Sequence, residues 1–266
     1  MDLKDRHVFI FDLDGVIYLG GVIVPGAREL LNLLNERNKI IYYVTNNSTR
    51  TRMKFCEKLL KMGIQAQTSQ IITSAFATAQ YLKQLAPKAT VYIIGEEGLI
   101  SEFTDAGFQI ILEPHSRKSI EYVIVGLDRN FTYQKLAIAL TALESGAKFI
   151  ATNTDPTLPT EKGNLPGAGT MVSALSTAAN SKPIFTIGKP NPFMLELILK
   201  KEGATPDKAV IIGDRYSTDI KAGLNANIGT ILVKTGTGIQ EIQLIPPTGP
   251  HPDLILESIA SIRHYL

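Results

Sequence analysis

Two aspartates, Asp12 and Asp14, stand at the end of an apolar run near the start of the chain, in "FIFDLDGVIY" (9–18). The run otherwise reads as a strand of the protein core, so the two carboxylates need an explanation. A buried strand is rigid and would hold the two carboxylates close together. In that position Asp12 can act as a covalent nucleophile. Asp14, beyond the strand end, can act as a general acid and then as a general base.

Polar side chains also follow three other apolar runs of strand length. Ligands of open α/β sheets bind beyond the carboxyl ends of the strands, so these positions are candidates for one shared site. A helix cap, a turn or a solvated lysine would explain each position singly, but not all the strand ends together. The candidates are Thr45, Asn46 and Asn47 after "IIYYV", Lys189 after "IFTIG", and Asp214 after "AVIIG" with Asp219 one turn further on.

These residue types point to phosphoryl transfer. Three carboxylates, Asp12, Asp14 and Asp214, with no His or Cys among the candidates at the strand ends, favour a hard cation, and oxygen ligands suit Mg²⁺ better than Zn²⁺. A lysine, a threonine hydroxyl, asparagine side chains and loop amides suit a phosphate. In phosphoryl transfer, positioning and charge neutralisation supply most of the catalysis. The strand ends therefore predict a Mg²⁺-assisted reaction in which Asp12 forms an aspartyl-phosphate.

The elements that must position these residues alternate between strand-length apolar runs and helical patterns. Such an alternation is typical of a parallel sheet that is covered by helices. The predicted fold class is therefore α/β, with a Rossmann-like parallel-sheet core. Strands are predicted at 7–13, 40–46, 183–188, 209–214 and 229–234, and helices at 26–38, 51–63, 191–203 and 217–227.

A second alternation fills the middle of the chain and is large enough for a small core of its own. One long continuous sheet is the alternative, but the candidate chemistry lies outside this segment on both sides. We therefore predict an inserted α/β cap domain at 80–181 and a catalytic core made of 1–79 and 182–266. The strands predicted in the middle segment are 91–95, 108–113, 121–127 and 148–153.

Composition limits the class of protein. The chain of 266 residues is 44% hydrophobic and 20% charged, which fits a soluble globular protein. Its net charge of +2 comes from 27 basic and 25 acidic residues that are well mixed, so nothing indicates nucleic acid or a membrane surface. The single cysteine, Cys56, fits a reducing compartment. With no signal-peptide pattern and no membrane-spanning run, a cytoplasmic location is expected.

Four motifs occur in order at the predicted strand ends: "DLDGV", "TNN", "GKPNP" and "GDRYSTDI". This set resembles the haloacid dehalogenase (HAD) superfamily of aspartate-nucleophile phosphatases, from about residue 7 to residue 258. The sequences "VPGA", "TNNS" and "TNTDPTLPTEKGNLPGAG", together with the long middle segment, further resemble the NagD-like, 4-nitrophenylphosphatase branch. In that branch a C2-type cap lies between the second and third motifs.

The resemblance implies a role for each residue around the metal. Asp12 would be the nucleophile and a metal ligand. Asp14 would be the acid/base and would bind Mg²⁺ through its backbone carbonyl. Asp214 would be a further ligand, and Asp219 would hold a metal-bound water from behind. Lys189 would orient Asp12 and neutralise the charge of the phosphoryl group.

The resemblance also implies the substrate-binding parts. Thr45, Asn46 and Asn47 would bind the transferring phosphoryl group, and residues 17–24 would form a mobile flap. Substrate would bind between core and cap, and closure of the cap would exclude water. The polar loop 155–162 is expected to face the active site and to select the substrate.

Two other functions stay open on the same motifs: a phosphomutase, and a non-catalytic protein that binds a phosphorylated ligand. The substrate is expected to be a small phosphorylated metabolite. Within the branch these include nucleotide monophosphates, sugar phosphates, phosphoglycolate and pyridoxal phosphate, with 4-nitrophenyl phosphate as a surrogate. A homodimer is expected only by analogy with the branch, and no nucleic acid or membrane partner is expected.

Overall fold

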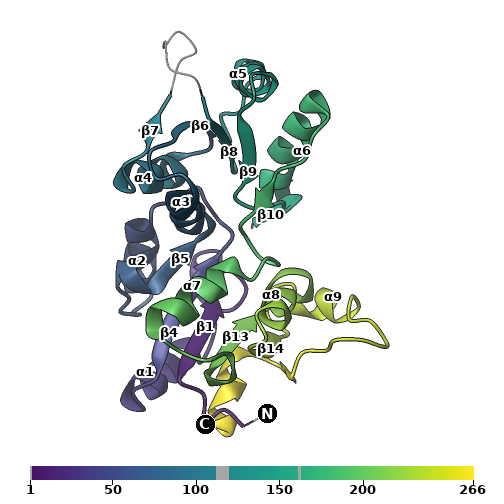
Figure 1. Ribbon diagram of the computed structural model, residues 1–266. Helices are drawn as coiled ribbons and strands as arrows, with labels where there is room; N and C mark the ends of the chain where they lie inside the picture. The colour runs from purple at the N-terminus through teal and green to yellow at the C-terminus, as the bar shows by residue number, and fades with distance from the viewer. Residues whose placement is uncertain (1, 112–119, 161–162) are drawn as a thin grey trace. The chain divides into compact units, whose positions relative to one another are not determined.

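The computed structural model describes residues 2–111, 120–160 and 163–266, and the chain forms two compact units (Figure 1). The first unit consists of residues 1–45, 55–72 and 189–266, and the second of residues 46–54 and 73–188. The chain therefore passes between the units several times, and each unit has a sheet of its own.

A six-stranded sheet forms the centre of the first unit in the described part of the chain, in the order β15-β14-β13-β1-β4-β5. β1 lies between β4 and β13 (Figure 1) and pairs in parallel with both. β13 and β14 are also parallel, as are β14 and β15. The strands are β1 (Val8–Asp12), β4 (Ile40–Thr45), β5 (Ile71–Thr73), β13 (Ala209–Gly213), β14 (Gly229–Val233) and β15 (Leu254–Leu256).

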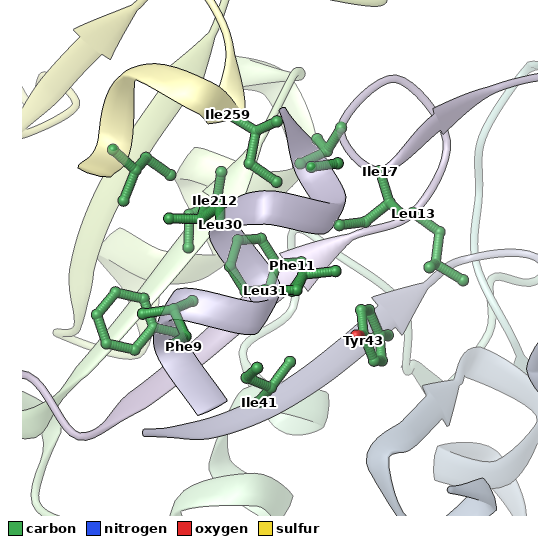
Figure 2. Packing of buried hydrophobic residues seen from close by; sticks show 14 of the residues in the cluster. Phe9, Phe11, Leu13, Ile17, Leu30, Leu31, Ile41, Tyr43, Ile212 and Ile259 are labelled. Carbon is green, nitrogen blue, oxygen red and sulfur yellow. The ribbon is translucent and has the colours of Figure 1, made fainter. Parts of the chain in front are cut away.

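The core of the first unit explains why β1 is a rigid support. All five residues of β1 are buried, because helices and neighbouring strands cover the sheet. Figure 2 shows Phe9 and Phe11 of β1 packed with Leu30 and Leu31 of helix α1 and with Tyr43 of β4. Each such side chain contributes roughly 1.5–3 kcal/mol by burial. Displacing the strand that carries Asp12 would therefore break several of these contacts.

Helices complete the first unit, largely where the sequence predicts them. α1 has its apolar face on the core, as the spacing of its leucines predicts. The α-helices that lie wholly or partly in this unit are α1 (Ala27–Glu36), α2 (Arg52–Lys61), α7 (Phe193–Glu202), α8 (Lys221–Asn225) and α9 (Gly238–Ile242). Other helical turns are η1 (Thr68–Gln70), η2 (Pro206–Lys208), the π-helical turn η3 (Tyr216–Ile220) and η4 (Ile259–Tyr265). A small hairpin joins β2 (Tyr18–Leu19) to β3 (Val22–Ile23) within the predicted flap.

The second unit has a separate hydrophobic core and, among its described residues, a five-stranded parallel sheet in the order β12-β9-β8-β6-β7. The strands are β6 (Thr90–Ile94), β7 (Gln109–Ile110), β8 (Tyr122–Val125), β9 (Lys148–Ala151) and β12 (Phe185–Thr186). The helices are α3 (Ser74–Leu85), α4 (Glu97–Asp105), α5 (Tyr133–Glu144) and α6 (Ala168–Ala179), and β10 (Thr157–Thr160) pairs antiparallel with β11 (Gly163–Pro166). Among the described residues the two large sheets are separate rather than one continuous sheet. Their parallel strands and the helices of both units confirm the predicted α/β class with a Rossmann-like parallel core.

One strand assignment was wrong. The run 183–188 was predicted as a strand of the core sheet, but its strand β12 pairs in parallel with β9 in the second unit. An apolar run shows that a strand is buried without showing which sheet contains it. The predicted strand at 108–113 is present as β7, while residues 112–113 lie outside the described residues. The domain limits at 80 and 181 stay a prediction.

A search of the helices in the described residues finds none long and apolar enough to cross a membrane.

Candidate active site

Three strand ends of the first unit bring predicted site residues to one edge of the sheet. Asp12 is the last residue of β1 and pairs in register with Val44, so Thr45 lies one residue further along β4. Asp214 directly follows β13, which pairs with β1 on its other side. Parallel strands place their carboxyl ends at the same edge, which is why residues about 30 and about 200 positions apart converge here.

Asp12, Asp214 and Asp219 form a cluster of buried carboxylates. Their exposed fractions are 8%, 3% and 1%, and one oxygen of each lies within 4.8 Å of the others. Asp219 reaches the cluster from the π-helical turn η3, where its carboxylate accepts a hydrogen bond from the backbone N–H of Arg215 at 3.0 Å. Buried charges of the same sign need a counter-charge.

Lys189 supplies part of that counter-charge. It is the only fully buried basic side chain within the described residues. Its ammonium group donates to Asp12 Oδ1 and lies 2.6 Å from Asp219 Oδ1. Burial alone would disfavour the charged form, but the two carboxylates outweigh burial and raise the pKa of Lys189 above its usual range. Lys189 is therefore protonated and fixes the side chain of Asp12.

The charge balance of the cluster fits a divalent cation. The cluster holds three carboxylates, and the ammonium group of Lys189 pairs with only two of them, which leaves an excess of negative charge in a buried place. Burial, reinforced by the charge of Asp219, raises the pKa of Asp214 to about 6. Burial also raises the pKa of Asp12 well above its usual range in spite of Lys189, with Asp219 and Asp214 adding to the effect. A bound divalent cation with a preference for oxygen ligands would offset the repulsion between these carboxylates and favour their ionised forms.

A loop that the sequence analysis missed orients Asp214. After β14 the chain runs "TGTG" (235–238), and Thr237 donates to Asp214 Oδ2 from its backbone N–H at 2.8 Å and from its hydroxyl at 3.0 Å. Thr235 donates its hydroxyl to the carbonyl of Gly15 at 2.6 Å, which ties the same loop to the "DLDG" turn. The sequence does indicate this loop as part of the site, because residues 235–238 directly follow the predicted strand at 229–234.

Asp14 lies two residues beyond β1 and is exposed, unlike Asp12. Its backbone bridges to Tyr18 at the start of the β2–β3 hairpin, and Gly15 donates its N–H to the Tyr18 carbonyl at 2.8 Å. A general acid/base must exchange protons with substrate and water, so exposure suits that role.

Asn46 and Asn47 directly follow Thr45 in the chain but belong to the second unit. The side-chain amide of Asn46 donates to the carboxylate of Asp155, and Asn47 Oδ1 accepts from the N–H and the hydroxyl of Thr49. The structure thus gathers Asp12, Asp214, Asp219 and Lys189 in the first unit, where Thr45 ends the neighbouring strand β4 and Asp14 follows β1. The two asparagines form part of a polar cluster within the second unit.

Comparison with known proteins identifies the class. A family model described as haloacid dehalogenase-like hydrolase matches residues 9–109, and a second, HAD-hydrolase-like model matches residues 186–262. An acid sugar phosphatase from Staphylococcus epidermidis is 42% identical over 255 residues, which cover 95% of this chain and 96% of the relative. An acid sugar phosphatase from Staphylococcus aureus is 39% identical over 264 residues, 98% of this chain and 100% of the relative.

Solved structures agree. A 4-nitrophenylphosphatase from Thermotoga maritima aligns with a TM-score of 0.90 at 29% identity and covers 98% of each chain. A p-nitrophenyl phosphatase from Archaeoglobus fulgidus aligns with a TM-score of 0.90 at 31% identity, over 98% of this chain and 100% of that one. The chain therefore belongs to the haloacid dehalogenase-like hydrolases. Within them it is a NagD-like phosphatase.

Proposed function

We propose that this phosphatase is a Mg²⁺-dependent phosphomonoesterase that acts through an aspartyl-phosphate on Asp12. The observation that carries the proposal is the buried cluster of Asp12, Asp214 and Asp219, with Lys189 paired to Asp12 and Asp219. Asp12, Asp214 and the backbone carbonyl of Asp14 would hold the metal. Asp219 would bind a metal-bound water and would not contact the metal itself. Mg²⁺ would neutralise charge on the phosphoryl oxygens and so favour attack by a carboxylate.

The side chains of the first unit account for both halves of the reaction. An oxygen of Asp12 attacks phosphorus, the bond to the leaving alcohol breaks, and Asp14 gives its proton to that alcohol. A water molecule then attacks the aspartyl-phosphate, Asp14 takes its proton, and inorganic phosphate leaves with Asp12 restored. Lys189 holds Asp12 in place and, with Thr45, Asn46 and Asn47, binds the phosphoryl group.

The substrate we propose is a small phosphorylated metabolite, with a sugar phosphate first among the candidates. The support is the similarity along nearly the full chain to relatives that are named acid sugar phosphatases. We expect 4-nitrophenyl phosphate to serve as a surrogate, in line with the names of the structural neighbours. We further propose that residues 80–181 act as the inserted cap domain. Residues 161–162 of the proposed selecting loop 155–162 lie outside the described residues.

The test is the release of inorganic phosphate from a panel of sugar phosphates, nucleotide monophosphates and 4-nitrophenyl phosphate, with Mg²⁺ or with EDTA. Metal-dependent release from one or more esters is expected. Conversion of one sugar phosphate into its isomer without net phosphate release would instead identify a phosphomutase. Binding of phosphate without turnover of any ester would identify a binding protein.

A further inference from the structure

Within the second unit, the side chains of Asp155, Asn153 and Ser74 all form hydrogen bonds with Asn46. Its side-chain amide nitrogen lies 3.1 and 3.3 Å from the two carboxylate oxygens of Asp155. Its backbone carbonyl accepts hydrogen bonds from Asn153 Nδ2 at 2.8 Å and from the Ser74 hydroxyl at 2.7 Å. Asn153 and Ser74 are buried, so these bonds are made away from bulk water.

These contacts leave one orientation for the Asn46 side chain. An ionised carboxylate only accepts hydrogen bonds, so Asp155 must face the amide NH₂ group and not the amide oxygen. On the other side, Gly188 approaches so closely that a Cβ atom there would lie 2.6 Å from Asn46 Oδ1. An amide nitrogen carries two N–H groups, and bonding one of them to Asp155 sets the direction of the other.

Asn153 connects the two parts of this arrangement. Its amide donates to the backbone of Asn46, and its Oδ1 accepts from the backbone N–H of Asp155 at 3.1 Å. The same side chain therefore fixes the main chain of Asn46 and the turn that presents Asp155. Asn153 and Asp155 both belong to the stretch "TNTD" (152–155), which follows β9 directly.

We propose that Asp155, supported by Asn153, is a positioning residue that holds the Asn46 amide in the direction needed to bind the phosphoryl group. The inference rests on the proposed function, in which Asn46 binds that group. It differs from the expectation that the loop beginning at Asp155 selects the substrate. A positioning residue affects every phosphate ester equally, whereas a selecting residue affects esters according to their organic part.

The experiment is a double-mutant cycle on Asp155 and Asn46. The variants are Asp155→Ala, Asn46→Ala and their combination, with Asp155→Asn as the conservative replacement, since an amide oxygen still accepts from Asn46. Each is assayed for kcat and KM on 4-nitrophenyl phosphate and on a sugar phosphate. Each is also titrated with inorganic phosphate by calorimetry in the presence of Mg²⁺, which measures binding without turnover.

A matched control separates positioning from loss of stability. Lys135→Ala removes a 2.6 Å ion pair to buried Asp128 elsewhere in the second unit. It is expected to lower the melting temperature while leaving phosphate affinity at the wild-type value. Assays are run well below the lowest melting temperature in the set.

We expect Asp155→Ala to lower kcat/KM for both esters and the affinity for inorganic phosphate by about 10- to 100-fold, with partial recovery in Asp155→Asn. In the Asn46→Ala background the same replacement should cost less than about twofold, because the group it positions is already gone. A full loss in that background, or a change confined to one ester with phosphate affinity unaltered, would overturn the proposal. If the wild type hydrolyses no ester, the proposed function fails, and the calorimetric cycle alone decides the positioning role. An unchanged phosphate affinity in Asp155→Ala, or a full loss of affinity in the Asn46→Ala background, would then overturn the proposal.

Discussion

Replacing Gly236 by alanine should uncouple Asp214 from the metal. Gly236 has a φ of +61° and lies in the loop that holds Asp214. A Cβ atom there would lie 2.2 Å from Asp214 Oδ2 and 2.7 Å from the Cα atom of Gly15. Real Cβ atoms essentially never approach closer than 3.0 Å, so the carboxylate or the loop must move by about 0.8 Å.

The displacement is large on the scale of metal coordination. Ligand distances in metal sites are held to about 0.2 Å, so a shift of this size removes Asp214 as an effective ligand. Losses of about 10- to 100-fold in metal affinity follow from disturbing the groups that orient a ligand. The backbone conformation costs alanine a further ~1 kcal/mol of folding stability.

Gly203 provides the matched control, because its φ of +60° is nearly the same and a Cβ atom there would meet nothing within 4 Å. Gly203→Ala and Gly236→Ala should lose similar amounts of stability from the backbone alone, and only Gly236→Ala should lose Mg²⁺ affinity in calorimetry. If both variants bind Mg²⁺ as tightly as the wild type, the reasoning about the Asp214 loop is wrong.

Two further predictions concern the charged cluster. Lys189→Met leaves Asp12 and Asp219 without the cation that they share. Urea denaturation in EDTA should therefore show that the free energy of unfolding falls by about 3 kcal/mol, and titration should show weaker binding of inorganic phosphate. If inorganic phosphate inhibited the variant as strongly as the wild type, Lys189 would not bind the phosphoryl group. Because burial raises the pKa of Asp214 to about 6, a proton competes with the metal below that pH, so calorimetric Mg²⁺ affinity should rise between about pH 5 and about pH 7 with protons released. The same raised pKa also affects the stability of the metal-free protein. The carboxyl of Asp214 stabilises the fold fully at a pH below the pKa that it has in the unfolded chain, and this stabilisation is lost as the pH rises through about 6. An affinity independent of pH would show that Asp214 is already ionised in the metal-free state.

Much of the site could be predicted from sequence for a simple physical reason. Parallel strands end at a common edge, so residues that follow buried apolar runs converge whatever their separation in the chain. Asp12, Thr45 and Asp214 were found in this way, and their strands β1, β4 and β13 are neighbours. The loop that contains Thr237 follows the same rule, because it begins at the carboxyl end of a predicted strand of the same sheet.

Other features depend on packing that local sequence does not encode. Lys189 was predicted from its motif, and the structure places it against Asp12, but the expectation that the preceding run belongs to the core sheet was wrong. That run pairs instead with β9. The sequence could not show this, because the apolar character of the run suits a strand of either sheet. Likewise, nothing in "TNN" shows that Asn46 bonds to Asp155, which lies 109 residues further on. Such a contact depends on the fold of the second unit as a whole.

The central claim is covalent catalysis by Asp12, and Asp12→Asn tests it most directly. The replacement keeps the size of the side chain while removing its ability to attack phosphorus, so the protein should stay folded. We would measure phosphate release from 4-nitrophenyl phosphate and from a sugar phosphate, with Mg²⁺, for the wild type and this variant. The account predicts metal-dependent release by the wild type and none by Asp12→Asn. Turnover by the variant at about a tenth of the wild-type rate or more, a barrier change of only about 1.4 kcal/mol, would contradict it.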